Sequence, residues 1–189
     1  MPSDASASGP KKEVEIKLRL TGVDEGRRRL RQAGFRVSRR RVFERNTIFD
    51  TPGQALRRRG LLLRLRTSGA RSLVTFKGPT ERGKHKIRKE IEFELRGGSE
   101  ACAEVFEALG YRPVFLYEKY RTEYVLKPAS AGRAMLDETP VGVFLELEGP
   151  PQWIDRTARR LGFREADYIT ATYAELHRSA GRGRRDMLF

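Results

Sequence analysis

The chain has 189 residues and 38% hydrophobic content, which favours one domain with a sizeable apolar core. Charged residues make up 34% and the formal net charge is +14, so we expect an anionic partner: nucleic acid, a membrane surface or a polyphosphate. The single cysteine excludes an intrachain disulfide. The two histidines are too few for a histidine-rich zinc site, so any metal would be held by carboxylate oxygens, which favours Mg²⁺, Mn²⁺ or Ca²⁺.

The two ends of the chain differ in composition from its middle. Residues 1–11 lack an apolar signal core and are predicted to be a disordered tail, and residues 179–189 are predicted to be a basic, flexible tail. No apolar run reaches transmembrane length. We therefore expect a cytoplasmic protein with no membrane contact and one folded domain over residues 12–178.

Period-2 alternation of polar and apolar residues predicts strands in this domain. It begins in Glu13-Val14-Glu15-Ile16-Lys17-Leu18-Arg19-Leu20, and the expected strands cover residues 12–20, 35–49, 61–67, 72–77, 87–95, 115–126, 133–138 and 143–148. Helices are predicted at 24–33, 99–109, 153–161 and 170–177, with one or two helical turns at 54–59. In the helix at 99–109, helical spacing predicts a buried stripe of Cys102, Val105, Phe106 and Leu109. The fold class is α+β: an eight-stranded antiparallel β-barrel, or a strongly curved sheet, with about four flanking helices.

The polar faces of these strands carry acids and bases two residues apart. The acids are Glu13, Glu15, Glu90, Glu92, Glu94, Asp137, Glu146 and Glu148, and the bases are Lys17, Arg19, Arg64, Arg66, Lys77, Arg88, Lys119 and Arg121. Taken singly, each face is typical of the solvated side of a half-buried strand. Taken together, they indicate one shared charged interior, in which opposite charges pair. Paired carboxylates can converge on a divalent cation and paired cations can clamp phosphates, which is what phosphoryl transfer needs.

In chain order, these motifs resemble those of the CYTH (triphosphate tunnel metalloenzyme) superfamily. Glu13-Val14-Glu15-Ile16-Lys17 matches its E-x-E-x-K signature. The later family strands are similar to Arg64-Leu65-Arg66, Thr75-Phe76-Lys77-Gly78-Pro79, Arg88-Lys89-Glu90-Ile91-Glu92, Lys119-Tyr120-Arg121, Leu136-Asp137-Glu138 and the segment from Gly142 to Glu148. The resemblance spans residues 13–177 and is closest to class IV adenylate cyclase-like members.

The resemblance implies a tunnel that binds a triphosphate end-on with Mg²⁺ or Mn²⁺. It implies metal ligation by Glu13, Glu15, Glu146 and Glu148, assisted by Glu90 and Glu92, and it places Asp137 with this acid set. It implies phosphate binding by Lys17, Arg64, Arg66, Lys77, Arg88, Lys119 and Arg121, and a catalytic group of Glu13, Glu15 and Lys17. In hydrolytic members water attacks phosphorus, whereas in cyclase members the ribose 3′-hydroxyl of ATP attacks the α-phosphorus. The same cage serves both reactions.

Three functions therefore stay open. We favour a metal-dependent triphosphatase acting on inorganic tripolyphosphate, thiamine triphosphate or a nucleoside triphosphate, because no further motif indicates adenine recognition. The first alternative is a class IV adenylate cyclase. The second, from another class, is a non-catalytic polyphosphate- or RNA-binding module, motivated by the net charge. A triphosphate-containing small molecule is thus the expected partner, with nucleic acid less favoured; a homodimer is compatible with such a barrel, although no interface patch is identifiable.

Several residues are predicted to lie outside the site. Arg19, Glu94 and Glu123 are expected at strand ends or on the surface. His85 and Lys86 are expected in a loop that could touch the distal group of the substrate, and a mobile surface loop is the default interpretation. The aromatic residues Tyr117, Tyr120, Tyr124 and Trp153 are expected to serve packing at the core or rim.

Overall fold

The structure is a computed structural model that describes residues 11–81, 83–96, 98–126, 131–181 and 186–189. Of the two predicted tails, residues 1–10 and 182–185 lie outside these described residues. The strands are β1 (Lys11–Leu20), β2 (Phe35–Asp50), β3 (Leu62–Ser68), β4 (Arg71–Lys77), β5 (Lys86–Leu95), β6 (Arg112–Leu126), β7 (Arg133–Thr139) and β8 (Gly142–Glu148). The helices are α1 (Val23–Gln32), α2 (Ala55–Arg58), α3 (Glu100–Ala108), α4 (Pro151–Arg160) and α5 (Tyr173–Ser179), with a 3₁₀ turn at Glu165–Asp167.

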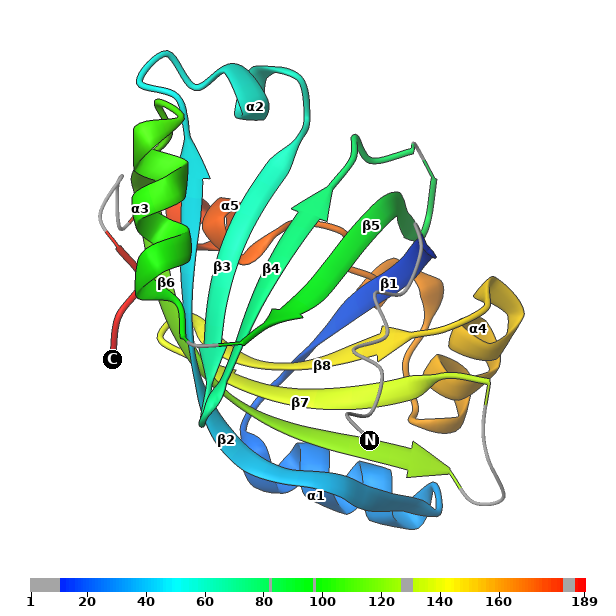
Figure 1. The fold of residues 1–189 in the computed structure, drawn as a ribbon. Helices are drawn as coiled ribbons and strands as arrows, with labels where there is room; N and C mark the ends of the chain where they lie inside the picture. Colours follow the sequence, from blue (N-terminus) through cyan, green and yellow to red (C-terminus); the bar gives the residue numbers. More distant parts are fainter. Residues whose placement is uncertain (1–10, 82, 97, 127–130, 182–185) are drawn as a thin grey trace.

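The eight strands form a closed barrel in the order β1-β5-β4-β3-β2-β6-β7-β8, as Figure 1 shows. Every neighbouring pair is antiparallel. β1 closes the barrel by pairing with β5 through its first half and with β8 through its second half. The predicted eight-stranded antiparallel barrel is therefore confirmed. No helix in the described ranges is long and apolar enough to cross a membrane.

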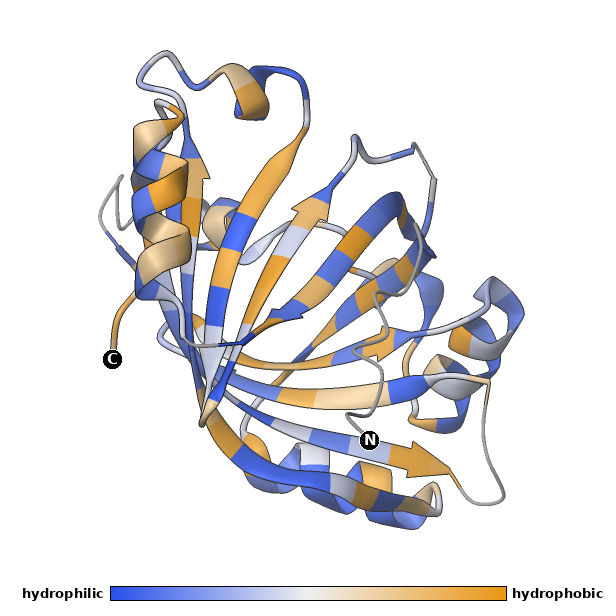
Figure 2. Cartoon of the chain, viewed as in Figure 1, coloured by the Kyte–Doolittle hydropathy of each residue, from blue (hydrophilic) through white to orange (hydrophobic). Residues whose placement is uncertain are grey.

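The main apolar core lies outside the barrel, between its wall and two helices. Along β1, Ile16 and Leu18 face this core with no exposed surface, while the residues between them face inward. Leu30 of α1 and Ile154 of α4 cover that outer face. Figure 2 shows the resulting alternation of hydrophilic and hydrophobic residues along the strands. Burial of apolar surface outside the wall leaves the interior free to carry charge.

A second apolar cluster lies under α3. Phe49 packs edge-on against Phe106, at 5.2 Å between ring centroids, and Cys102 joins the same cluster. The prediction of a buried stripe is wrong for two of its four residues, because Val105 is 56% exposed and Leu109 is 68% exposed. The cluster includes Ala103 instead. A short helix lying on a convex barrel wall buries a narrower strip than one packed into a groove.

The third cluster fills the barrel interior where α5 enters. Tyr173 of α5 lies among Tyr117 and Phe144, whose side chains share faces with the charged interior residues of β6 and β8. Met187 belongs to the same cluster and has no exposed surface.

The chain segment at Met187 also extends the barrel wall. β7 pairs with β6 only from Tyr120 to Tyr124, so the earlier part of β6 needs another partner on that edge. Met187 provides it: its N–H donates to the Leu116 carbonyl and its carbonyl accepts from the Glu118 N–H, both at 2.9 Å. Residues 186–189 are therefore docked, which corrects the prediction of a flexible tail for this part of residues 179–189.

Candidate active site

The barrel encloses a cavity of about 840 Å³. All the predicted site residues except Asp137 line it: Glu13, Glu15, Lys17, Arg64, Arg66, Lys77, Arg88, Glu90, Glu92, Lys119, Arg121, Glu146 and Glu148. Residues from six strands thus converge because each lies on the inward-facing side of its strand. The excluded residues Arg19 and Glu94 lie outside this lining, as predicted.

At one end of the cavity, two carboxylates share one ammonium group. Lys77 Nζ lies 2.7 Å from both oxygens of Glu13 and 2.8 Å from Glu90. Burial and the neighbouring Glu15 act to raise the pKa of Glu13, but the Lys77 charge outweighs them and the pKa is lowered. Burial raises the pKa of Glu90, and the Glu13 carboxylate beside it adds to the increase. Of this pair, Glu90 is thus the more readily protonated.

Glu15 occupies the next position along β1 and also has two cations. Its Oε1 lies 2.7 Å from Lys86 Nζ and 3.3 Å from Lys17 Nζ. Lys17 also contacts Glu146 at 3.4 Å. Burial acts against ionisation of Glu15, yet Lys17 and Lys86 hold its pKa well below the usual value.

Lys86 lines the cavity but was not among the predicted site residues. The prediction of a mobile loop for His85 and Lys86 is wrong, since they are only 5% and 3% exposed. β5 begins at Lys86, so Lys86 shares the inward face of Arg88 and Glu90, and extending the alternation by one step would have found it. His85 Nε2 lies 2.8 Å from Asp155 of α4, which anchors the segment before Lys86. Burial lowers the pKa of Lys86 to about 8.

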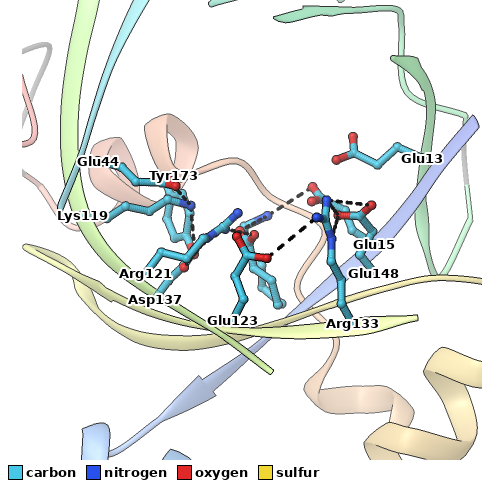
Figure 3. A network of polar contacts seen from close by, with 12 residues as sticks. Glu13, Glu15, Glu44, Lys119, Arg121, Glu123, Arg133, Asp137, Glu148 and Tyr173 are labelled. Carbon is cyan, nitrogen blue, oxygen red and sulfur yellow. Dashed lines mark hydrogen bonds and ion pairs between the residues drawn. The ribbon is translucent and has the colours of Figure 1, made fainter. Parts of the chain in front are cut away.

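Asp137 is the centre of a second cluster, shown in Figure 3. It has no exposed surface, and Lys119 Nζ donates to it at 2.7 Å. Arg121 donates to both of its oxygens, at 2.6 and 2.7 Å, and also bonds Glu146. The Tyr173 hydroxyl donates to it at 2.8 Å. Asp137 therefore lies behind the cavity wall and orients two of its cations.

Glu44 on β2 is the second missed residue. It is 1% exposed, and its Oε2 lies 3.7 Å from both Lys119 and Arg66. Burial acts to raise its pKa, but Lys119 and Arg121 outweigh burial and lower the pKa to about 2. Register shifts between Val37 and Val42 interrupt the alternation of β2. The inward-facing residues could therefore be assigned only from the regular part of the strand after these shifts.

The β3 arginines form a third group. Arg66 bonds Glu92 at 2.7 Å, and Arg64 bonds the Thr75 hydroxyl at 3.1 Å and the Tyr117 hydroxyl at 3.2 Å. The buried Nε atoms of both arginines have no hydrogen-bond partner within the described protein. These donors remain for a ligand or water.

The charges of the interior nearly balance. Seven predicted acids with Glu44 give eight carboxylates, and seven predicted bases with Lys86 give eight cations. With all groups ionised these two sets cancel, and Arg133, which lines the cavity and pairs with Glu148, leaves the interior with one net positive charge. A triphosphate would bring excess negative charge, which a bound divalent cation would compensate.

The acids fit a hard metal ion by donor chemistry, because carboxylate oxygens are the ligands that Mg²⁺ and Mn²⁺ prefer. In the described ranges, no group of three or more His, Cys, Asp or Glu residues is arranged as a preformed metal site. The reason lies in the ion pairs: Glu13 is held by Lys77, Glu15 by Lys86, and Glu148 by Arg133 at 2.9 Å. A metal would replace these cations as the carboxylates' partners.

The closed eight-stranded antiparallel barrel with its charged interior matches the triphosphate-tunnel fold. Consistent with this, a family model described as "CYTH domain" matches residues 11–173, and the chain belongs to the CYTH family. CYTH triphosphate tunnel enzymes are in general dependent on a divalent metal.

The chain is also similar to individual proteins. "Putative adenylate cyclase MJ0240" of Methanocaldococcus jannaschii is 29% identical over 136 residues, which cover 72% of this chain and 75% of that protein. Among solved structures, PH1819 of Pyrococcus horikoshii is 24% identical with a TM-score of 0.74, covering 89% and 99% of the two chains. A Hippeastrum protein, HpAC1, is described as a "putative adenylyl cyclase" with dominant triphosphatase activity; it is 18% identical with a TM-score of 0.63, over 89% and 96% of the chains.

Proposed function

We propose that this protein is a divalent-metal-dependent triphosphatase that binds its substrate in the barrel interior. The observation that carries the proposal is the set of cations on opposing strands around one cavity, most of them paired with a buried carboxylate. Such fixed cations bind an anion without having to be reorganised, and phosphoryl transfer depends on positioning and on charge neutralisation.

The interior residues divide into two roles. The phosphate chain would be held by Lys17, Arg64, Arg66, Lys77, Arg88, Lys119 and Arg121, with Lys86 added to this set. Glu13, Glu15, Glu146 and Glu148, assisted by Glu90 and Glu92, would hold Mg²⁺ or Mn²⁺. When bound, the metal would neutralise charge on the phosphates and lower the pKa of a bound water. We assign Asp137, predicted with the metal ligands, to positioning Lys119 and Arg121, because within the described part of the chain its carboxylate accepts hydrogen bonds from those cations and Tyr173.

Adenylate cyclase activity is the alternative, supported by the name of the Methanocaldococcus relative. Both reactions use the same cage and differ in the attacking group, which is water in one case and the ribose 3′-hydroxyl in the other. The triphosphatase activity described for the Hippeastrum protein supports hydrolysis as chemistry that this fold accommodates.

Product analysis tests the proposal. Purified protein is incubated with Mg²⁺ or Mn²⁺ and, separately, tripolyphosphate, thiamine triphosphate and ATP. Orthophosphate release supports the triphosphatase, whereas cyclic AMP with pyrophosphate would replace it by the cyclase. Glu15→Ala should abolish turnover while the circular dichroism spectrum is retained. Lys17→Ala and Arg66→Ala should weaken triphosphate binding far more than the exposed control Arg28→Ala.

The non-catalytic alternative has a separate outcome. A polyanion-binding module would bind RNA and polyphosphate equally well in EDTA, with affinity falling steeply as salt increases. If no substrate turns over with either metal and binding follows this pattern, the triphosphatase proposal is wrong.

A further inference from the structure

The C-terminal segment, residues 186–189, contributes one side chain to the barrel interior. Met187 forms a parallel β-bridge with Tyr117 of β6, and in such a bridge the two side chains lie on the same side of the sheet. The Tyr117 hydroxyl accepts from Arg64 inside the barrel, so this side is the inner one. Met187 therefore faces inward without any exposed surface, from a segment that follows the residues matched by the family model.

Hydrogen bonds on both sides of Met187 hold this segment against β6, beside which the C-terminal end of the chain runs in Figure 1. The backbone of Met187 bonds the Leu116 carbonyl and the Glu118 N–H, as described above. In addition, the Leu116 N–H donates to the Asp186 carboxylate at 2.8 Å, and the Phe189 N–H donates to the Glu118 carboxylate at 3.3 Å. The position of the Met187 side chain is therefore fixed by the backbone on either side of it.

Inside the barrel, Met187 shares a buried apolar cluster with two tyrosines whose hydroxyls bind residues of the site. The rings of Tyr117 and Tyr173 lie 6.2 Å apart. The Tyr117 hydroxyl accepts from Arg64 at 3.2 Å, and the Tyr173 hydroxyl donates to Asp137 at 2.8 Å; Figure 3 shows Tyr173 beside Asp137. Each ring is thus bonded to the charged site at its hydroxyl and packed in the cluster of Met187.

The placement of these rings matters to the cations of the site. Hydrogen bonds weaken steeply when their distance or angle changes, and a tyrosine hydroxyl moves with its ring. The Tyr173 ring also has the Nζ atoms of Lys17 and Lys119 at 5.2 Å from its centroid, a cation–π distance. Protein interiors are close-packed, so removal of the Met187 side chain would leave a cavity into which neighbouring rings can shift. Such a shift would disturb several phosphate-binding cations together.

We propose that Met187 is a positioning residue for phosphate binding: it holds the rings of Tyr117 and Tyr173 so that their hydroxyls orient the cations of the site. This inference rests on the proposed function and adds to it a residue far along the chain from the charged motifs. Met187 is not one of the described residues that line the cavity, so its effect on the substrate passes through the two rings.

The experiment measures the Kd of tripolyphosphate by calorimetry in EDTA, where metal-dependent turnover cannot occur. Met187→Ala should raise the Kd about tenfold, the size expected when hydrogen bonds to charged groups of the site are weakened. Met187→Leu keeps a similar apolar volume and should stay within about twofold of wild type. The matched control is Ile154→Ala, which opens a cavity at an equally buried position of α4 outside the barrel wall and should also stay within about twofold.

A second background tests whether Met187 acts through the tyrosine hydroxyls. The double variant Tyr117→Phe and Tyr173→Phe lacks both hydroxyls, so adding Met187→Ala to it should raise the Kd by less than about threefold, because residues that act as a unit are not additive. Asp186→Ala keeps the inference testable if Met187→Ala does not fold. It removes one hydrogen bond that docks the segment, at an exposed position, and should raise the Kd about threefold.

The outcomes separate this inference from the proposed function. An unchanged Kd in Met187→Ala, an equal increase in Ile154→Ala, or a full effect of Met187→Ala without the two hydroxyls would overturn the positioning role and leave the triphosphatase intact. If wild type binds tripolyphosphate but turns over none of the triphosphates with Mg²⁺ or Mn²⁺, the proposed function fails, and the Kd values still decide the role of Met187. If wild type does not bind tripolyphosphate in EDTA, the inference is wrong, because correctly placed cations bind the anion without a metal.

Discussion

Replacing Asp137 by asparagine removes one negative charge from the most buried part of the interior. Among the described ion pairs, Lys119 would retain the one with Glu44, at 3.7 Å, and Arg121 would retain the one with Glu146. Breaking a buried ion pair from one side costs about 3 to 5 kcal/mol. Because asparagine preserves the shape and can still accept from Tyr173, we expect the lower end, about 3 kcal/mol. For a chain of this size, that corresponds to a melting temperature lower by about 6 to 12 °C.

Thermal unfolding with and without ligand checks this prediction. Glu138→Gln is the matched control: it is the next residue on β7, faces outward and pairs with Arg41 on the surface, so it should cost less than about 1 kcal/mol. Tripolyphosphate should raise the melting temperature of Asp137→Asn by more than that of wild type, since the variant's interior has one more uncompensated positive charge than the wild-type interior. A wild-type melting temperature, or a smaller ligand-induced increase, would refute the assignment of Asp137 as the charge centre of the site.

Three further predictions follow from the same structure. Tyr173→Phe removes one hydrogen bond to Asp137 and should cost about 1 kcal/mol in urea unfolding; a cost below about 0.3 kcal/mol would mean that the bond contributes nothing. Met187→Ala should cost about 2 to 4 kcal/mol, whereas Leu188→Ala, at a 44% exposed position, should cost under about 0.5 kcal/mol; equal costs would show that the segment is not docked. Most inward carboxylates have lowered pKa values in the folded state, so their stabilisation is present above pH of about 4.5 and is lost as the pH falls towards the folded pKa of Glu44, about 2. Urea unfolding at pH 6, 4 and 3 should show this loss as a falling free energy of unfolding, and Glu44→Gln should make the fall with pH less steep. A free energy of unfolding that stays constant over this range would contradict the prediction.

The barrel and most of its lining could be predicted because alternation assigns a face to each strand residue. On β1, for example, Glu15 and Lys17 face the cavity, and Ile16 between them faces the apolar core on the other side of the wall. The alternation does not determine which strands pair with one another. The order β1-β5-β4-β3 is seen only in the structure, and periodicity alone does not determine it.

The residues that were missed share a physical cause: each lies where the local pattern is broken. Glu44 follows the register shifts of β2, and Lys86 stands at the first position of β5, after a polar loop. Tyr173 comes from a helix, so no strand period could place it inside a barrel. The stripe of α3 failed at Val105 because helical spacing predicts a face but not how wide a contact the barrel wall provides.

The closure of the barrel by β1 has a consequence for the order of folding. β1 is made first, yet Lys17 pairs with Glu146 and Glu13 with Arg88, so both of its partners are synthesised much later. Non-local pairing of this kind slows folding, because the chain loses the entropy of a long loop before the stabilising contacts form. An open barrel would meanwhile expose its inner surface to other chains. Because most side chains of that surface are charged and well solvated by water, the slow step exposes less apolar surface to aggregation than an apolar interior would.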